Sequence, residues 1–376
     1  MEKIRFDNFV SLNRGFDLPD DKIIEGKYPV IASTSIKAYH NQFKVKAPIV
    51  VTGRSGSLGK VQYVDEDGWP LNTALYAKDF HGNNPKYVYY FLQTMHLEQY
   101  NAGAGVPTLN QNHLHSLKIL IHKLPTQQKI ASILSAYDNL IQNYKKQIEA
   151  LQTAASELYK EWFVRFRFLG WKNAKFENGI PEGWKIERIG NVGEVIGGGT
   201  PSTENEEYWD GDIPWLSPVD LSDNTNVYVS RGSKNITELG LKKSSAKMMP
   251  TGTVLLSSRA PVGYVALAKN PICTNQGFKS VVCNTSVIQP IYLYYYFRMN
   301  KNYLQSIASG ATFPELSGSM MKKMKVLLPT EKVQQEFSKR ARIFIEKAEL
   351  LSEQITNLTQ QRGLLLPRLM SGKIII

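Results

Sequence analysis

The sequence predicts an α+β fold class: two mixed α/β domains separated by two long antiparallel coiled-coil helices, with a pseudo-twofold repeat along the chain. Three observations predict it. The second half of the chain repeats the motifs of the first half in the same order. Short apolar segments punctuated by Gly, Pro, Asn and Ser, which indicate short strands, fill most of each half. A long heptad pattern ends each half.

The repeat is carried by a tyrosine-rich segment, a segment rich in Ala and Gly, and an LPT motif. In the first half they are NPKYVYYFLQ (84–93), AGAGVPTL (102–109) and LPTQQKI (124–130), and in the second half QPIYLYYYFR (289–298), ASGATFPEL (308–316) and LPTEKVQQEF (328–337). GRSGSLGKV at 53–61 corresponds in the same way to SRAPVGYV at 258–265. We expect the tyrosine-rich segments to be helices whose rings pack in the core, with stacking on unpaired bases as the alternative.

Two long helices are predicted from apolar residues that recur every seven positions, the pattern of a coiled-coil seam. The first helix has the lines Leu134, Ile141, Ile148, Ala155 and Tyr137, Tyr144, Leu151, Leu158, and the second has Phe337, Phe344, Leu351, Leu358, Leu365 and Ala341, Ala348, Ile355, broken by Arg362. The helices should begin near Pro125 and Pro329, and the second should end before Pro367. We expect the helices to pair with each other; the alternative is that each packs on its own domain.

These patterns divide the 376 residues into four parts. Residues 1–123 form the first domain and 171–327 the second. Residues 124–170 form the first long helix with the central region, and 328–376 form the second long helix. A chain of this length can build two or three domains with cores of their own.

The chain is basic: 45 Lys and Arg against 33 Asp and Glu give a net charge of +12 and an isoelectric point near 9.4. This favours a polyanionic partner, with an ordinary basic protein as the alternative. Cys273 and Cys283 are the only cysteines, so neither a disulfide framework nor a cysteine-rich zinc site is expected. His113, His115 and His122 have no accompanying ligand pattern, so they are expected on the surface and no metal site is predicted.

The start of the chain, MEKIRFDNFV, has no apolar signal core. No apolar run approaches the length of about 18 residues that a membrane helix needs. We therefore expect a cytoplasmic protein that has no contact with a membrane.

Several stretches imitate nucleotide-binding or catalytic motifs, but their spacing fails. TGRSGSLGK at 52–60 has Arg54 where a phosphate-binding loop needs its first glycine, and a strand pattern follows it instead of a helix. PD at 19–20 with EGK at 25–27 imitates a metal-dependent nuclease, but too few residues separate the carboxylates for a hairpin to bring them together. GGG at 197–199 leads into a proline turn, and no [N/D]-P-P-[Y/F] methyltransferase loop occurs. We expect no catalysis and no cofactor in this chain.

Over nearly its whole length the sequence resembles the specificity (S) subunit of type I restriction–modification systems. The most specific parts are ELYKEWFVRFRF at 157–168, which is similar to the family's central region, and LLLPRLMSGKI at 364–374, which is similar to its C-terminal signature. KYPVIASTSIKAYHNQF at 27–43 and YWDGDIPWLSP at 208–218 are similar to segments of the family's target recognition domains.

The resemblance implies a DNA-binding subunit. In this family each of two target recognition domains reads one half of a bipartite target in double-stranded DNA, and the helices between them dock methyltransferase (M) subunits, expected here to be two. Restriction/translocase (R) subunits join the complex separately, and S-adenosylmethionine is expected in the M subunit. Two alternatives remain open: a DNA-acting enzyme with an unrecognised active site, and a coiled-coil scaffold.

The residues expected to contact DNA lie on loops where basic or amide side chains stand beside small residues, because phosphate contacts give affinity while Arg on guanine and Asn or Gln on adenine give discrimination. The first domain contributes Arg54, Ser55, Ser57 and Lys60, with Ser33, Ser35, Lys37 and His40 on an adjoining loop, and the second contributes Ser258, Arg259, Asn275, Gln276 and Lys279. Arg54 and Arg259 are expected at matching positions, with a surface salt bridge or a strand-edge cap as the alternative for each. For the Ser and Asn residues the alternative is ordinary turn chemistry. The coiled-coil and partner interface is expected to comprise Leu134, Tyr137, Ile141, Tyr144, Ile148, Leu151, Leu158, Phe344, Leu351, Ile355 and Leu358.

Overall fold

The structure is a computed structural model that describes residues 1–376 except 104, 223, 225, 260 and 311–313. The repeated segments at 102–109, 258–265 and 308–316 therefore each include positions that lie outside the described residues.

The chain forms two compact units. Unit 1 comprises residues 1–143 and 355–376, and unit 2 comprises residues 144–354. The two long helices are α4 (Leu124–Tyr159) and α10 (Glu331–Met370). Each unit therefore combines strands and short helices with a part of both long helices. The four domain boundaries drawn from the sequence stay a prediction.

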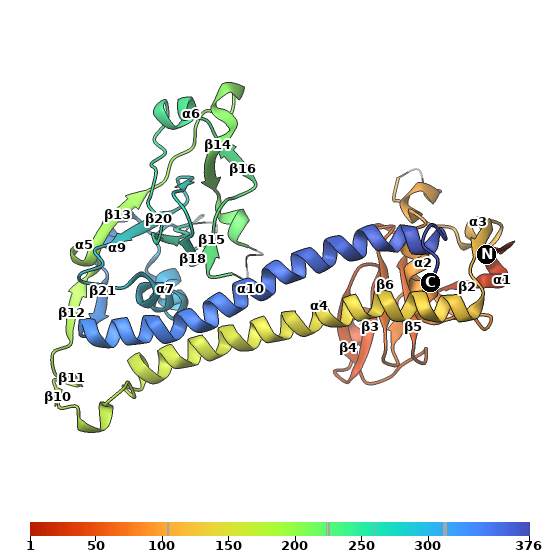
Figure 1. Ribbon diagram of the computed structural model, residues 1–376, viewed down its shortest axis with the longest axis horizontal. Helices are drawn as coiled ribbons and strands as arrows, with labels where there is room; N and C mark the ends of the chain where they lie inside the picture. The colour runs from red at the N-terminus through yellow and green to blue at the C-terminus, as the bar shows by residue number, and fades with distance from the viewer. Residues whose placement is uncertain (104, 223, 225, 260, 311–313) are drawn as a thin grey trace. The chain divides into compact units, whose positions relative to one another are not determined.

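Unit 1 is built from small sheets and short helices around α2 (Figure 1). Its strands are β1 (Glu2–Arg5), β2 (Ser11–Arg14), β3 (Tyr28–Ile31), β4 (Ile36–His40), β5 (Ile49–Gly53), β6 (Val61–Val64), β7 (Trp69–Pro70), β8 (Ala74–Asp79) and β9 (Lys118–Ile121), and its short helices are α1 (Phe6–Phe9), α2 (Pro85–Gln93) and α3 (Gln111–His115). One sheet has the order β2-β8-β5-β6, a second has the order β4-β3-β7, and β1 pairs with β9 in a separate ribbon. β5 is buried along its whole length because it is an interior strand rich in β-branched residues.

Unit 2 has sheets of the same kind, one of them with an additional strand. Its strands are β10 (Phe176–Glu177), β11 (Ile180–Pro181), β12 (Lys185–Arg188), β13 (Gly193–Gly197), β14 (Trp209–Leu216), β15 (Tyr228–Val229), β16 (Lys234–Ile236), β17 (Val254–Leu256), β18 (Val265–Ala268), β19 (Cys273–Thr274), β20 (Lys279–Cys283) and β21 (Lys325–Leu328), and its short helices are α5 (Ile189–Val192), α6 (Glu238–Lys242), α7 (Pro290–Met299), α8 (Lys301–Ile307) and α9 (Gly318–Lys323). The sheets have the orders β13-β20-β17-β18-β15 and β16-β14-β19, and the ribbons are β12-β21 and β10-β11.

The same strand pairing occurs in both units. The short strand β7 runs parallel to β3, with Ile31 opposite Pro70, and the short strand β19 runs parallel to β14, with Leu216 opposite Thr274. The β1–β9 ribbon of unit 1 has its counterpart in the antiparallel β12–β21 ribbon of unit 2. The repeat that the sequence motifs indicate is therefore present in the backbone hydrogen bonds.

A buried glutamine joins each long helix to the tyrosine-rich helix of its unit. Gln127 accepts from the Asn84 N–H at 3.0 Å and donates to the His122 carbonyl at 2.8 Å. Gln334 accepts from the Gln289 N–H at 2.9 Å and donates to the Pro329 carbonyl at 2.8 Å. Asn84 and Gln289 directly precede α2 and α7, so the same side chain fixes the same helix start in both units.

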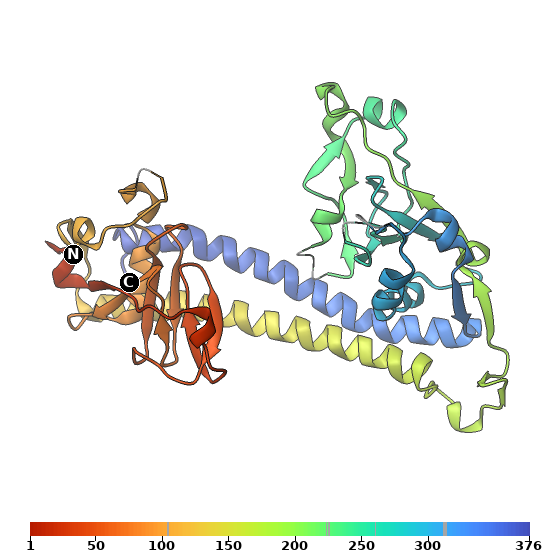
Figure 2. The ribbon, with the colours of Figure 1, turned by 180° about the vertical axis from the view of Figure 1, so that it is seen from behind.

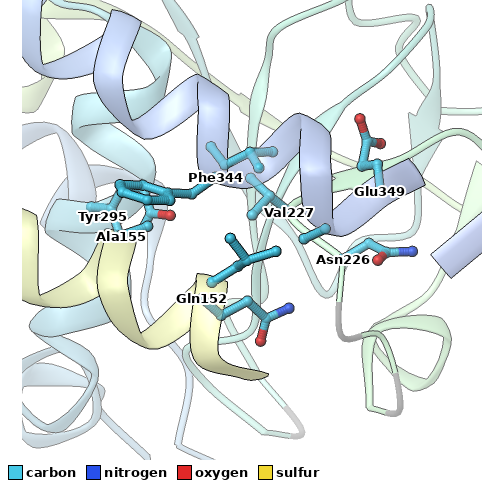
Figure 3. Close-up of a pocket in the computed structure, with 10 residues that line it drawn as sticks. Gln152, Ala155, Asn226, Val227, Tyr295, Phe344 and Glu349 are labelled. Carbon is cyan, nitrogen blue, oxygen red and sulfur yellow. The ribbon is translucent and has the colours of Figure 1, made fainter. Parts of the chain in front are cut away.

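Within each unit, α4 and α10 lie side by side and run antiparallel (Figures 1 and 2). In unit 1, His122, just before α4, bonds to the Leu369 carbonyl at 3.0 Å, while Asp138, further along α4, pairs with the earlier residue Arg362 of α10. In unit 2, the rings of Tyr159 and Phe337 lie 5.9 Å apart. Figure 3 shows Gln152 and Ala155 of α4 facing Phe344 and Glu349 of α10 around a small pocket that Asn226, Val227 and Tyr295 complete.

The heptad prediction is confirmed by burial along both helices. The fully buried seam residues are Leu134, Ile141, Ile148 and Ala155 of α4 with Phe337, Ala341, Ala348 and Leu351 of α10. The half-buried ones are Tyr137, Tyr144, Leu151 and Leu158 of α4 with Phe344, Ile355, Leu358 and Leu365 of α10. Arg362, which breaks the second line, is the residue that pairs with Asp138.

The prediction that the second helix ends before Pro367 is wrong, because α10 continues to Met370. A proline inside a helix usually kinks or ends it, because its ring clashes with the carbonyl of the residue four positions earlier, here Gly363. Pro367 donates no hydrogen bond, but its carbonyl accepts from the Ser371 N–H at 3.0 Å. Burial of Leu369 and Met370 in the core of unit 1 favours the continued helix.

The tyrosine-rich segments are helices, and their rings pack in the cores of the two units. Tyr87 and Tyr90 of α2 are buried, as are Tyr292, Tyr294 and Tyr295 of α7, while Tyr89 and Tyr296 are half-buried. Core packing is therefore confirmed over base stacking for the buried rings.

Of the three histidines expected on the surface, only His113 is exposed. His122 is buried under α10, and His115 is half-buried because its Nε2 accepts from the Leu12 N–H at 3.0 Å. Tertiary hydrogen bonds of this kind leave no trace in a local sequence pattern. Among the described helices, none has both the length and the apolar character that crossing a membrane requires.

Candidate DNA interface

Unit 1 holds the loop after β5 between two other backbone segments. The Arg54 N–H donates to the Thr73 carbonyl at 2.8 Å, and the Leu109 N–H donates to the Arg54 carbonyl at 2.8 Å. The Gly56 N–H donates to the Pro107 carbonyl at 3.0 Å. Because both sides of the loop are hydrogen-bonded, its side chains project from a fixed backbone.

The Arg54 side chain is half-buried and retains most of its hydrogen-bonding capacity. Its Nη1 donates to the Asn72 carbonyl at 3.3 Å, which uses one of about five guanidinium donors. Among the described residues it has no carboxylate partner. Ser57 and Lys60 on the same loop are exposed, and Ser55 is half-buried. This loop can therefore offer a fixed guanidinium together with a mobile ammonium group.

The loop after β3 lies beside the Arg54 loop. A Cβ atom added to Gly53 would meet the Ser57 carbonyl oxygen at 1.9 Å and the Ser33 Cβ at 3.3 Å, so only glycine permits this close approach. The Gln62 side chain of β6, the strand that follows the Arg54 loop, donates to the Ala32 carbonyl of the loop after β3 at 2.8 Å. The structure thus brings together Ser33 and the Arg54 loop, which are distant in sequence, and Ser35 follows on the same turn.

Lys37 and His40 lie on β4, and they differ in accessibility. Lys37 is exposed and pairs with Asp20. His40 is only 4% exposed, its Nδ1 accepts from the Ile24 N–H at 3.1 Å, and its ring packs against Trp69. The expectation of an accessible loop position for His40 is therefore wrong, because the end of β4 is folded against the core.

In unit 2 the loop after β17 is held in the same manner. The Ser258 N–H donates to the Gly277 carbonyl at 2.7 Å, and the Leu316 N–H donates to the Ser258 carbonyl at 2.9 Å. Ser258 is fully buried, and its hydroxyl also donates to Gly277 at 3.1 Å. This side chain holds the loop together and is not accessible to a base edge.

Glu315 pairs with both basic residues of unit 2 that are predicted to contact DNA. Arg259 Nη1 lies 3.7 Å from one Glu315 oxygen, and Lys279 Nζ lies 3.3 Å from the other. All three side chains are at most about one third exposed, so the pairs weaken but do not remove the positive charge of the loop. The alternative of a surface salt bridge applies to Arg259, although DNA could still exchange with this carboxylate.

The amide residues of unit 2 fill different roles. Asn275 Oδ1 accepts from the Gly277 N–H at 2.8 Å, which is ordinary turn chemistry. Gln276 is exposed, and its Oε1 accepts from the Thr200 hydroxyl. Of these two amide side chains, Gln276 is therefore the more accessible to DNA.

These hydrogen bonds correct the pairing of the two arginines. In each unit a leucine N–H donates to the carbonyl of the first loop residue. The N–H of that first residue donates to the carbonyl of Thr73 in unit 1 and to the carbonyl of Gly277 in unit 2. By this criterion Arg54 corresponds to Ser258, and Ser55 corresponds to Arg259. The expectation that Arg54 and Arg259 occupy matching positions is wrong, because side chains alternate in an extended segment and a shift of one residue reverses their direction.

Sequence reasoning missed a basic segment beside the loops of unit 2. A Cβ atom added to Gly199 would lie 2.3 Å from the Ser245 hydroxyl oxygen, so the segment 242–247 packs directly against the residue next to Thr200. Lys242, Lys243 and Lys247 in this segment are exposed. The run KKSSAK is visible in the sequence. Only the contact between Gly199 and Ser245, with the Thr200–Gln276 hydrogen bond, shows that it lies near the loop of Gln276.

Within the described residues no cluster of His, Cys, Asp and Glu is arranged to hold a metal ion. Cys273 and Cys283 are free thiols, and burial raises the pKa of Cys273 to about 11 and that of Cys283 to about 12. Such thiols are poor nucleophiles and poor metal ligands at neutral pH.

A family model for the type I restriction modification DNA specificity domain matches residues 2–153 and 181–360. The chain belongs to this family. The match covers both halves of the chain, so the predicted fold class with two domains and the predicted role in DNA recognition are confirmed at the level of the family.

Individual relatives agree with this family. The type I restriction enzyme MjaIX specificity subunit of Methanocaldococcus jannaschii is 48% identical over 161 residues, which are 42% of this chain and 37% of that protein. The HindI specificity subunit of Haemophilus influenzae is 25% identical over 331 residues, which are 71% of each protein. A crystal structure of the type I S subunit from M. genitalium has the same fold, with a TM-score of 0.67 at 17% identity over 98% of this chain and 96% of that chain.

Proposed function

We propose that this chain is the DNA sequence-recognition subunit of a type I restriction–modification complex, and that unit 1 and unit 2 each read one half of a bipartite target. The observation that carries the proposal is the doubled loop scheme. In both units the loop that follows a central strand is held on two sides. A leucine N–H donates to the carbonyl of the first loop residue, and the N–H of that residue donates to the carbonyl of Thr73 in unit 1 or Gly277 in unit 2. Each loop presents an arginine beside polar residues, the arrangement that base reading requires.

Base reading and phosphate binding are divided among the loop residues. Arg54 in unit 1 and Arg259 in unit 2 are the candidates for bidentate contacts to guanine, and Gln276 is the candidate for adenine. Lys60 and Lys279 are the candidates for contacts to phosphates, where a point charge suffices. Asn275 and Ser258 hold the loop of unit 2 in shape, and His40 supports β4.

The chemistry belongs to partner chains in this proposal. Two M subunits bind along α4 and α10 and carry S-adenosylmethionine, and R subunits join through the complex. The exposed parts of the helix pair support this, because α10 presents Ile343 and Leu350 to solvent, where an amphipathic helix could cover them. The complex acts on DNA in the cytoplasm, and this chain contributes no catalytic residue.

The proposal is tested by reconstituting DNA methylation from separate subunits. Methylation-sensitive sequencing of a host that carries the whole system first defines the target. The purified chain with S-adenosylmethionine should then leave this target unmethylated, and addition of the M subunit should produce methylation at that sequence alone. Methylation by the chain without any partner would overturn the non-catalytic role. Methylation of unrelated DNA by the complex would overturn the recognition role.

A further inference from the structure

The β12–β21 ribbon of unit 2 carries cations that lie outside the recognition loops. Arg188 and Lys325 are direct cross-strand partners in this ribbon. Lys322 and Lys323 end α9, one residue before β21. All four side chains are exposed. Over the described part of the chain none of them has an ion-pair partner, and together they are called the ribbon patch.

The ribbon patch costs stability unless something neutralises it, since like charges directly opposite each other destabilise a β ladder. The carboxylate nearest in the ribbon, Glu187, is already engaged by the Asn191 amide at 3.0 Å and by Lys185 at 3.8 Å. These two contacts, the Asn191 hydrogen bond first, hold the pKa of Glu187 below its usual value. Glu194 lines the open hollow that Lys322 also borders.

The corresponding ribbon of unit 1 carries its own counter-ion. There Arg5 is the cross-strand partner of Lys118, but Asp7 accepts two hydrogen bonds from the Arg5 guanidinium at 3.0 and 2.9 Å. Asp7 is the second residue of α1, and the second residue of α5 in unit 2 is Gly190. Unit 2 therefore has no carboxylate at the position where unit 1 neutralises its ribbon.

The glycine in unit 2 also makes room for a lysine. A Cβ atom added to Gly190 would come within 3.2 Å of the Lys322 Cβ and 3.3 Å of its carbonyl oxygen. An aspartate at position 190 would crowd this turn of α9. Two changes therefore act together in unit 2: the acid is absent, and the backbone and Cβ of Lys322 occupy the space beside Gly190.

The ribbon patch is close to the recognition loop of the same unit. The Leu316 N–H binds the Ser258 carbonyl, Ser317 caps α9, and α9 ends at Lys323. A helix of this length spans about 9 Å. One strand of DNA covers that distance with about three nucleotides. A duplex held by the loop of unit 2 therefore has backbone phosphates within reach of the patch.

We propose that the ribbon patch is a second DNA contact of unit 2, which binds backbone phosphates beside the half-site without reading sequence. The inference rests on the proposed DNA-recognition function and adds to it a separate contact surface. Phosphates supply the negative charge that Asp7 supplies in unit 1. Release of counterions from the DNA then makes this contact a source of affinity that weakens as salt concentration rises.

The test is the salt dependence of DNA binding by the complex with its M subunits. A variant with Arg188→Gln, Lys322→Gln, Lys323→Gln and Lys325→Gln is compared with the wild type on the mapped target and on an unrelated duplex of equal length. The slope of log K against log salt should become shallower by about 0.9 for each phosphate that the variant no longer binds, equally on both duplexes. The recognised sequence should not change.

The two ribbons provide a matched control. Lys325→Gln should reduce the slope, whereas Lys118→Gln at the twin position of unit 1 should leave it nearly unchanged. Equal effects of the two substitutions would contradict the assignment to unit 2, and so would an unchanged slope in the four-residue variant that keeps its target preference. Loss of the M subunit from that variant on size-exclusion chromatography would identify a protein contact instead and overturn the proposal. A wild-type complex without preference for its target would refute the underlying DNA-recognition function, which is a different result.

Discussion

In the proposed function, the half-buried Arg54 on its fixed loop is the candidate base-reading residue of unit 1. Arg54→Ala should relax discrimination at one base pair of one half-site by about 1–3 kcal/mol, because a bidentate contact is read at a single position. Binding to a panel of duplexes with single base-pair changes measures this. Lys60→Ala, on the same loop, should instead weaken binding to every duplex alike. If Arg54→Ala also weakened all duplexes equally, Arg54 would be a phosphate contact.

The structure also predicts a pH dependence at His115. Burial is the main cause that lowers the pKa of His115 below its usual value of 6.5; the Arg5 charge adds to it, and the Asp7 charge opposes it. The neutral ring is also the form that accepts the Leu12 N–H. Because the unfolded chain binds a proton that the folded chain does not, this contribution to stability is present above pH 6.5 and is lost as the pH falls below it.

The measurement is the urea midpoint of unfolding between about pH 5 and 7.5, read from a probe in unit 1. His115→Gln keeps an acceptor for the Leu12 N–H and removes the titrating group. The wild type should lose stability toward acid more steeply than this variant. Identical pH profiles for the two proteins would show that His115 does not contribute.

The limits of sequence reasoning at this scale come from tertiary hydrogen bonds. The sequence repeat matches Arg54 with Arg259, but the hydrogen bonds from the Leu109 and Leu316 N–H groups show that Ser258 occupies the position equivalent to Arg54. His40 was expected on one loop with Ser33, Ser35 and Lys37, yet it ends β4, and the Ile24 backbone and Trp69 bury it. Both errors concern side-chain direction, which residue type alone does not determine. Whether the remaining loop residues contact DNA stays a prediction.

Among the elements, the two long helices were the most predictable because their heptads are long and regular. The end of α10 was not, since the burial of Leu369 and Met370 in the core of unit 1 outweighs the usual effect of Pro367. Arg362, visible only as a break in the seam, is paired with Asp138 in unit 1. The sequence indicates that such a position is unusual but does not identify its partner.

This ion pair gives a prediction about the helix pair of unit 1. Asp138 also accepts from the Tyr90 hydroxyl at 2.5 Å, and burial, together with Asp138, raises the pKa of Tyr90. Asp138→Ala leaves Arg362 half-buried without its carboxylate and should reduce the free energy of unfolding by about 1–3 kcal/mol. Chemical denaturation of the variant and the wild type measures this difference.

Unit 2 supplies the control for that prediction. Gln127 and Gln334 are equivalent residues of the two long helices. The residue as far after Gln334 as Asp138 is after Gln127 is Ile345, which is buried. The corresponding position of Arg362 is Ala155 by the same count. The double variant Asp138→Ile, Arg362→Ala should therefore recover most of the stability that the single substitution loses. A double variant less stable than Asp138→Ala would show that the pair contributes more than mutual neutralisation.

For the whole molecule, the sequence repeat predicted a chain with two similar parts, and the family match covers both halves. The parts are not copies: unit 2 has a five-stranded sheet where unit 1 has four strands, and it lacks the Asp7 that neutralises the ribbon of unit 1. Such differences depend on insertions and on contacts between distant residues, so a repeat of motifs does not reveal them. The proposed reading of two different half-sites requires differences of this kind.

The central claim is that each unit reads its half of the target independently. It is tested most directly by replacing residues 171–327 with the corresponding region of a family member that has a different target, and then mapping methylated sites in a host that carries the chimera and the M subunit. The account predicts a target in which one half-site changes to that of the donor while the other half-site stays as in the wild type. Methylated sites in which both halves change, or neither does, would contradict it.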